Sequence, residues 1–250
     1  MPTTAAPAPA RLCGGVASPR FQPALVNDGL TTFCDSINLR AGGRLGMHVL
    51  DTIILLTGEV EHPVLGSILQ GHDPKLTIRP VVTFADVAAL EPRVLGRARL
   101  IAFATDVVVA PDILDRLAYG AYNFHPGPPH FPGWRPAHFA IHHHAKEFGA
   151  TAHVMLERVD AGPIVGVELF AIPAGSTVGG LEELAYAQLA RLFGRLAKPL
   201  ATQIERLAEL PTRWSGKKSS RRAFAAMCGI PLDLPSDELD RRVAGITSAG

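Results

Sequence analysis

An amide and an imidazole stand one residue apart in the segment YGAYNFHPGPPHFPGWRP, which spans residues 119–136. If Asn123 and His125 lie on one strand, their side chains point to the same side, because alternate residues of a strand share a face. A buried structural histidine would give the same pattern. Asp160, in the loop sequence RVDAGPIVG, adds a carboxylate that can orient or charge an imidazole. These are the groups that stabilise an oxyanion and move a proton during acyl transfer.

Alternating apolar runs and short helical patterns are expected to position these three residues. The predicted strands are 51–58, 76–84, 98–105, 121–124, 150–157 and 167–173, and the predicted helices are 60–71, 85–97, 110–120, 135–149 and 177–209. This order favours an α/β fold with a Rossmann-like, doubly wound, mostly parallel sheet and a short C-terminal appendage. Ligands bind beyond the carboxyl ends of the strands in such sheets, so we expect Asn123, His125 and Asp160 at that edge.

The 250-residue chain has room for one large domain with small additions. Residues 1–46 are rich in Ala, Pro and Thr and show no sustained period, which is typical of a disordered extension. We expect a catalytic domain at 47–210 and a short C-terminal appendage at 211–250. The sequence gives no indication of the oligomeric state.

Charge and cysteine content exclude several other classes. The formal net charge of +1 gives no general electrostatic attraction for nucleic acid. Three widely spaced cysteines are typical of a reduced cytoplasmic protein. Neither a membrane-spanning apolar run nor a secretory signal is evident, so we expect no membrane association. No metal is expected at His142, His143 and His144, because adjacent residues of a helix point in different directions.

The segments around these residues closely resemble the formyltransferase family that uses 10-formyltetrahydrofolate. The resemblance rests on Asn123-x-His125-Pro126 and, about 35 residues later, on Val159-Asp160-x-Gly162, and it covers roughly residues 50–200. The family includes methionyl-tRNA, glycinamide ribonucleotide and sugar N-formyltransferases, as well as formyltetrahydrofolate deformylase. It implies the α/β fold described above and an enzyme of one-carbon metabolism.

The resemblance also implies a role for each residue. An amine would attack the formyl carbon on N10 of the folate, while Asn123 and protonated His125 donate hydrogen bonds to the developing oxyanion. Asp160 would keep His125 charged and help to pass the amine proton to the leaving nitrogen. The matching cofactor-binding positions are Val109, Leu114, Leu156, Glu157, Arg158 and Val159. The matching acceptor-side positions are Pro128, Trp134 and Arg135, in a loop that departs from the family pattern.

The acceptor and the reaction type stay open between several alternatives. About 40 residues follow the long predicted helix, too few for the tRNA-binding domain of methionyl-tRNA formyltransferases. A small-molecule amine is therefore favoured over tRNA. The alternatives are hydrolysis of 10-formyltetrahydrofolate to formate and tetrahydrofolate, and a non-catalytic folate- or nucleotide-binding module. The basic residues Lys217, Lys218, Arg221 and Arg222 either contact phosphate or belong to a solvated linker.

Overall fold

The computed structural model describes residues 49–215 and 217–247, which all belong to the compact unit Gly46–Gly250. The predicted extension at 1–46 lies outside these residues. Among the helices of the described part, none is both long and apolar enough to cross a membrane.

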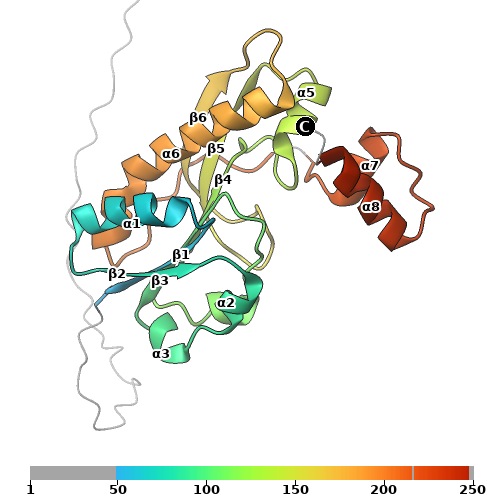
Figure 1. The fold of residues 1–250 in the computed structure, drawn as a ribbon. Coiled ribbons are helices and arrows are strands. Elements are labelled where there is room, and N and C mark those ends of the chain that lie inside the picture. Colours follow the sequence, from blue (N-terminus) through green and yellow to red (C-terminus); the bar gives the residue numbers. More distant parts are fainter. Residues whose placement is uncertain (1–48, 216, 248–250) are drawn as a thin grey trace, which may run out of the picture. The chain divides into compact units, whose positions relative to one another are not determined.

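A six-stranded sheet with the strand order β2-β1-β3-β4-β5-β6 organises the described chain (Figure 1). The first four strands of this order are parallel, β5 runs antiparallel to β4, and β6 runs antiparallel to β5. The strands are β1 (Thr52–Leu56), β2 (Thr77–Val81), β3 (Ala98–Phe103), β4 (Ala121–His125), β5 (Glu147–Val154) and β6 (Ile164–Ala171). The predicted Rossmann-like, mostly parallel sheet is confirmed.

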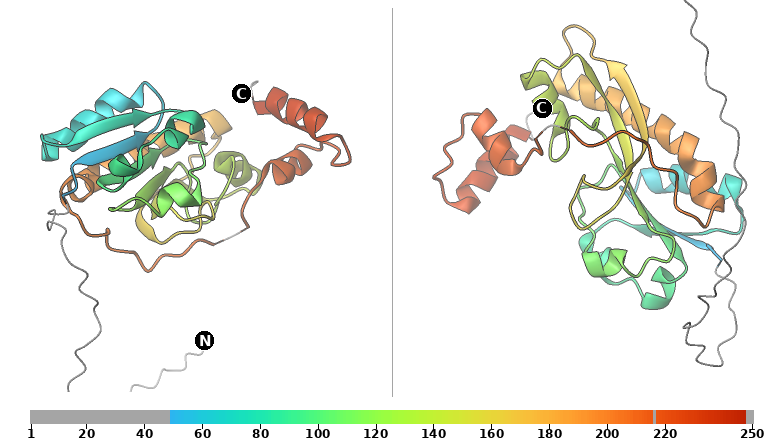
Figure 2. Two further views of the ribbon diagram at one scale, coloured as in Figure 1. Left: turned by 90° about the horizontal axis from the view of Figure 1, so that it is seen from below. Right: turned by 180° about the vertical axis from the view of Figure 1, so that it is seen from behind.

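Helices cover both faces of the sheet (Figures 1 and 2). They are α1 (Glu61–His72), α2 (Phe84–Ala88), α3 (Pro92–Leu95), α4 (Pro111–Leu114), α5 (Pro136–His142), α6 (Val178–Thr202), α7 (Arg221–Met227) and α8 (Ser236–Thr247). The helices α1 and α6 pack on one face, and the short helices α2, α3 and α4 pack on the other. Each face of the sheet has its own apolar core, because successive side chains of a strand point to opposite faces. On β1, Ile53 belongs to the core under α1 and α6, and Ile54 belongs to the core under α2, α3 and α4.

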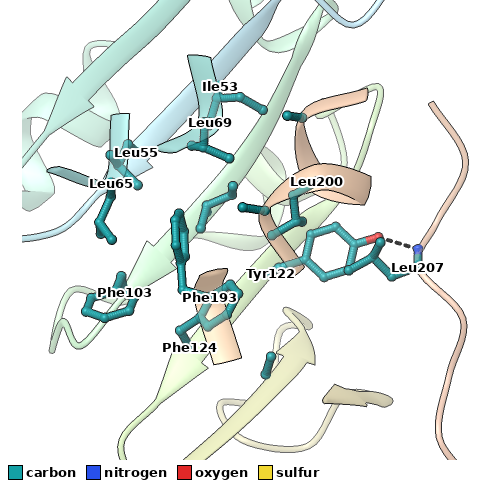
Figure 3. Packing of buried hydrophobic residues seen from close by; sticks show 14 of the residues in the cluster. Ile53, Leu55, Leu65, Leu69, Phe103, Tyr122, Phe124, Phe193, Leu200 and Leu207 are labelled. Atoms are coloured by element: carbon teal, nitrogen blue, oxygen red, sulfur yellow. Dashed lines mark hydrogen bonds between the residues drawn. The ribbon is translucent and has the colours of Figure 1, made fainter. Parts of the chain in front are cut away.

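Aromatic rings fill the core between the sheet and α6 (Figure 3). The ring centroids of Phe124 and Phe193 lie 5.3 Å apart, and those of Phe103 and Phe193 lie 5.7 Å apart in an edge-to-face arrangement. Phe124 and its alternate neighbour Tyr122 thus anchor β4 on the α6 face. The intervening residues Asn123 and His125 must therefore point to the opposite face of the sheet.

Several predicted boundaries were wrong for identifiable reasons. The predicted helix at 135–149 ends at His142, and Gly149 lies inside β5, where a Cβ would collide with the Glu168 carbonyl of the neighbouring strand. The predicted helix at 110–120 is only the single turn of α4. The strand predicted at 150–157 begins three residues earlier and ends at Val154.

The long predicted helix at 177–209 ends at Thr202, because buried Arg99 of β3 binds its last turn. The Arg99 guanidinium donates to the carbonyls of Leu200 at 2.6 Å and of Glu205 at 3.1 Å. The chain then turns back, and the amide of Leu207 donates to the Tyr122 hydroxyl at 2.9 Å (Figure 3). A single buried cation thus fixes the end of α6 against the sheet.

Candidate active site

A cavity of about 430 Å³ opens on the sheet face that α6 does not cover. Its walls come from the loop after β3, the carboxyl end of β4, the loop after β5 and the residues that precede and begin α7. Asn123, His125 and Asp160 all line this cavity, although Asp160 lies far from the other two in sequence. The structure therefore brings the three predicted catalytic residues together.

Asn123 is positioned by its cross-strand neighbour on β5. Its Cα pairs with that of His153, and the Asn123 Nδ2 lies 3.1 Å from the His153 Nε2. Nδ1 of His153 lies 2.9 Å from the Val154 carbonyl, which can only accept, so Nδ1 carries a proton. Since His153 is almost completely buried, its ring is a fixed support for the amide of Asn123.

Asp160 reaches the site by a route that differs from the expected one. The predicted approach along the carboxyl edge of the sheet was wrong, because β5 is antiparallel and ends at Val154, opposite the first half of β4. The following loop folds back over the sheet face. The Asp160 Oδ2 accepts a 2.8 Å hydrogen bond from the Gly133 amide and lies 3.9 Å from the His125 Nδ1, while Oδ1 lies 3.3 Å from the His153 Nε2.

The surroundings of Asp160 favour its charged form. Burial opposes ionisation, but the contact with His153, the charges of His125 and His153 and the hydrogen bond from Gly133 together lower the pKa of Asp160 to about 2. The residue also has a φ of 49°, a conformation that non-glycine residues seldom adopt. Such backbone strain is concentrated at functional sites, where surrounding contacts hold it.

His125 is a buried imidazole with one free nitrogen. Burial lowers the pKa of His125, and the neighbouring His153 lowers it further, against the opposing effects of Asp160, the Phe131 carbonyl and Asp106. A lowered pKa favours the neutral ring near pH 7, whereas the resemblance implied a protonated ring. Its Nε2 has no hydrogen-bond partner, and a Cβ at Gly127 would approach this atom to 2.6 Å. Glycine at this position avoids a collision with the buried Nε2.

The other predicted binding residues divide into two groups. Those that line the cavity are Val109, Leu156, Arg158, Val159, Trp134 and Arg135. Leu114 instead packs against the core beneath the sheet, Glu157 is exposed, and Pro128 is buried in the loop after β4, so these three do not line the cavity. Glu157 lies in the loop after β5, where its neighbours Leu156 and Arg158 line the cavity and Glu157 does not.

The sequence analysis missed part of the cavity walls. The loop Ala104–Val108 was not singled out, although its position after the buried strand β3 at the carboxyl edge could have indicated it. The structure places His153 in contact with both Asn123 and Asp160. Of the four basic residues considered for phosphate, Lys218 and Arg221 line the cavity, whereas Lys217 and Arg222 do not.

The fold is an α/β fold with Asn123, His125 and Asp160 in one cavity on a mostly parallel sheet, and comparison with known proteins supports the same class. Residues 100–190 match the family described as formyl transferase. The resemblance seen in the motifs is thus confirmed.

Curated relatives and solved structures agree with this assignment. The chain is 30% identical over 166 residues to a methionyl-tRNA formyltransferase of Dinoroseobacter shibae, a match that covers 65% of this chain and 52% of the relative. The chain thus spans about half the length of the curated relatives it matches. A sugar N-formyltransferase from Shewanella sp. superposes with a TM-score of 0.59 at 18% identity, covering 77% of this chain and 87% of the other.

A formyltransferase from Anoxybacillus kamchatkensis has the same fold. It superposes with a TM-score of 0.57 at 17% identity and covers 73% of this chain and 92% of its own. That protein was crystallised with UDP-4,6-dideoxy-4-formamido-L-AltNAc and tetrahydrofolate.

Proposed function

We propose that this protein transfers a formyl group from 10-formyltetrahydrofolate to an amine, with Asn123, His125 and Asp160 as the catalytic residues. The observation that carries the proposal is the convergence of these three side chains in one cavity, with the Nε2 of His125 unpartnered beside it. The family assignment and the formyltransferase relatives support the same reaction.

In the proposed reaction the amine nitrogen attacks the formyl carbon and a tetrahedral intermediate forms. Asn123 donates an Nδ2 hydrogen bond to the oxygen that becomes negatively charged, because one Nδ2 hydrogen remains after the contact with His153. Neutral His125 accepts the ammonium proton and returns it to N10 as the C–N bond breaks. Asp160 stabilises the imidazolium that exists between these two steps.

The apolar side of the cavity suits a folate ring. Val108, Leu156 and Val159 line the cavity although 56%, 47% and 40% of their surfaces are exposed, respectively. Exposed apolar side chains gathered in a concave site are typical of a surface that a flat ligand covers. We therefore place the 10-formyltetrahydrofolate here, between the β3 and β5 loops.

The opposite side of the cavity suits an acceptor that carries negative charge. Lys218 and Arg221 line it together with Arg135, and the guanidinium carbons of both arginines lie within 6 Å of the centre of the Trp134 ring, at 5.2 and 5.7 Å. Arg135 also lies 4.0 Å from Glu182, and Arg221 lies 3.6 Å from Asp240, so a phosphate would compete with these carboxylates for the guanidinium groups. The indole offers a stacking surface for a sugar or base. We propose a small-molecule amine that carries phosphate, with tRNA as the less favoured acceptor.

Two neighbouring arginines provide a matched test of the acceptor side. Arg221→Glu and Arg222→Glu change the net charge equally, but only Arg221 lines the cavity. With UDP-linked amino sugars as probes, we expect Arg221→Glu to raise the acceptor KM about 10-fold or more and Arg222→Glu to leave it within about 2-fold. Equal effects of the two substitutions would contradict the proposed acceptor site.

The reaction itself is tested by following tetrahydrofolate release from 10-formyltetrahydrofolate, with and without amines. The panel contains free amino sugars, UDP-linked amino sugars, glycinamide ribonucleotide and methionyl-tRNA. Release that depends on an amine supports the transferase. Rapid release with stoichiometric formate and no amine would identify a hydrolase instead. Folate binding without turnover under any condition would leave only a binding module.

A further inference from the structure

The connection between α6 and α7 contacts the loop after β4 and the loop that carries Asp160, on either side of the proposed catalytic residues. Figure 2 shows this connection returning along the sheet from the end of α6 before it enters α7. Four of its residues contact the site loops: Trp214, Ser215, Lys218 and Ser219, which we call the strap.

Trp214 packs against both imidazoles of the site. Its ring lies 5.0 Å from that of His153 and 6.0 Å from that of His125, and both contacts are edge-to-face. The indole Nε1 donates a 2.8 Å hydrogen bond to the Gly162 carbonyl, two residues beyond Asp160. Trp214 does not line the cavity, so it supports the histidines from outside the ligand-binding space.

The rest of the strap joins the two site loops to each other. On the Asp160 loop, the Lys218 ammonium donates to the Val159 carbonyl at 2.9 Å. On the loop after β4, the Ser215 amide donates to the Pro129 carbonyl at 2.9 Å, and the Ser219 hydroxyl contacts the Trp134 carbonyl at 2.6 Å. These contacts flank Asp160 on one side and the loop after His125 on the other.

Gly133 shows how closely the strap and the site are joined. Its φ is +99°, and a Cβ at this position would collide with the Ser219 carbonyl, so only glycine allows the strap to approach. The amide of the same residue donates to the Asp160 carboxylate at 2.8 Å. A shift of the strap would therefore reach Asp160 through Gly133 as well as through Gly162.

We propose that Trp214 is a positioning residue, whose indole holds the His125 and His153 rings and ties the Asp160 loop to the strap. This inference rests on the proposed function, because it concerns the same three catalytic residues. Trp214 contacts no ligand. It acts by fixing the distance between His125 and Asp160 and by keeping water away from the imidazoles.

The groups around His125 determine which measurement reports on this role. Asp160 faces its Nδ1, while His153, Asp106 and the Phe131 carbonyl lie near the ring, and Trp214 is the uncharged group packed on it. Burial is the main cause that holds the pKa of His125 down. If the indole is removed, water reaches the ring, its protonated form becomes easier to form, and its titration midpoint rises.

The experiment compares full-length Trp214→Ala and Trp214→Phe with Arg213→Ala, an exposed neighbour that donates only to nearby backbone carbonyls. We expect Trp214→Ala to lower kcat about 10- to 100-fold, with the folate KM within about 2-fold. The His125 midpoint, followed by NMR without any substrate, moves to higher pH. Trp214→Phe keeps a ring over the histidines but loses the Nε1 donor. In this variant we expect an unchanged His125 titration midpoint and a lower kcat.

Thermal melts show whether each variant is folded, and Trp214→Phe carries the test if Trp214→Ala does not fold. An unchanged His125 midpoint in Trp214→Ala, or a kcat of Trp214→Phe equal to that of the unaltered protein, would overturn the proposal. A fall in kcat of similar size in Arg213→Ala would also overturn it. Because the NMR titration needs no turnover, its result stands even if the proposed formyl transfer is not found.

Discussion

At the residue scale, the charges of His125 and Asp160 set the pH range in which the proposed chemistry operates. The pKa of Asp160 is lowered from 3.8 to about 2, so its stabilising contribution is complete above pH 4 and is lost as the pH falls toward 2. The lowered pKa of His125 likewise makes the folded state more stable as the pH rises, because the folded state binds the His125 proton less readily than the unfolded state. Both groups therefore favour a charged aspartate beside a neutral imidazole at pH 7.

The pH dependence of kcat/KM tests this protonation state. Since neutral His125 accepts the proton, kcat/KM should rise with pH along a limb whose midpoint lies below 6.5 and should be level from pH 7 to 8. A steady fall between pH 6.5 and 8 would indicate that the protonated imidazole is the active form. Asp160→Asn should remove most of the activity across the whole range, because the imidazolium loses its partner.

At the element scale, Arg99 joins β3 to the end of α6 and so holds one face of the sheet. Its side chain is completely buried and donates to the carbonyls of Tyr119, Leu200 and Glu205. Replacing it with an apolar side chain leaves buried carbonyls without donors, and each such group costs about 1–3 kcal/mol.

Arg99→Leu should therefore lower the free energy of unfolding by about 2–4 kcal/mol. Arg93→Leu is the matched control, because the Arg93 side chain is 83% exposed and should change stability by less than about 0.5 kcal/mol. Urea unfolding measures the change in the free energy of unfolding for both variants, and we expect the m-value to be unchanged. A loss below about 1 kcal/mol in Arg99→Leu would show that α6 is held by its apolar face alone.

The same scale shows what the sequence could predict and where it could not. The buried strand at 98–103 and the alternation on β4 were predictable, because apolar runs and period-two spacing depend on local residues. The direction of β5 was not, since hydrophobicity does not distinguish parallel from antiparallel pairing. The position of Asp160 could not be predicted either, because its φ of 49° and its hydrogen bond from Gly133 depend on contacts distant in sequence. The contacts of the strap could not be predicted for the same reason.

At the scale of the whole molecule, the proposed active site belongs to one compact unit. Every residue that lines the cavity lies between Ala104 and Arg221, within Gly46–Gly250. We therefore propose that the catalytic domain begins at 47 and that residues 211–250 form an appendage that completes the site.

Deletion of residues 1–46 tests this organisation. The shortened chain should keep its turnover within about 2-fold, and its thermal midpoint should move by less than about 3 °C, which corresponds to about 1 kcal/mol. A loss of more than 10-fold in turnover, with the fold intact by circular dichroism, would place part of the site in the deleted segment. Deletion after Arg213, in contrast, should abolish turnover, because it removes the strap together with Lys218 and Arg221.

The most direct test of formyl transfer follows the carbon itself. We would incubate 10-formyltetrahydrofolate, labelled with ¹³C in the formyl group, with the protein and the amine panel, and record ¹³C spectra. The account predicts that the label moves to a formamide in an amine-dependent reaction. It also predicts that Asn123→Ala slows this transfer about 10²- to 10³-fold while the protein stays folded. Label found in free formate, or a rate unchanged by Asn123→Ala, would contradict the account.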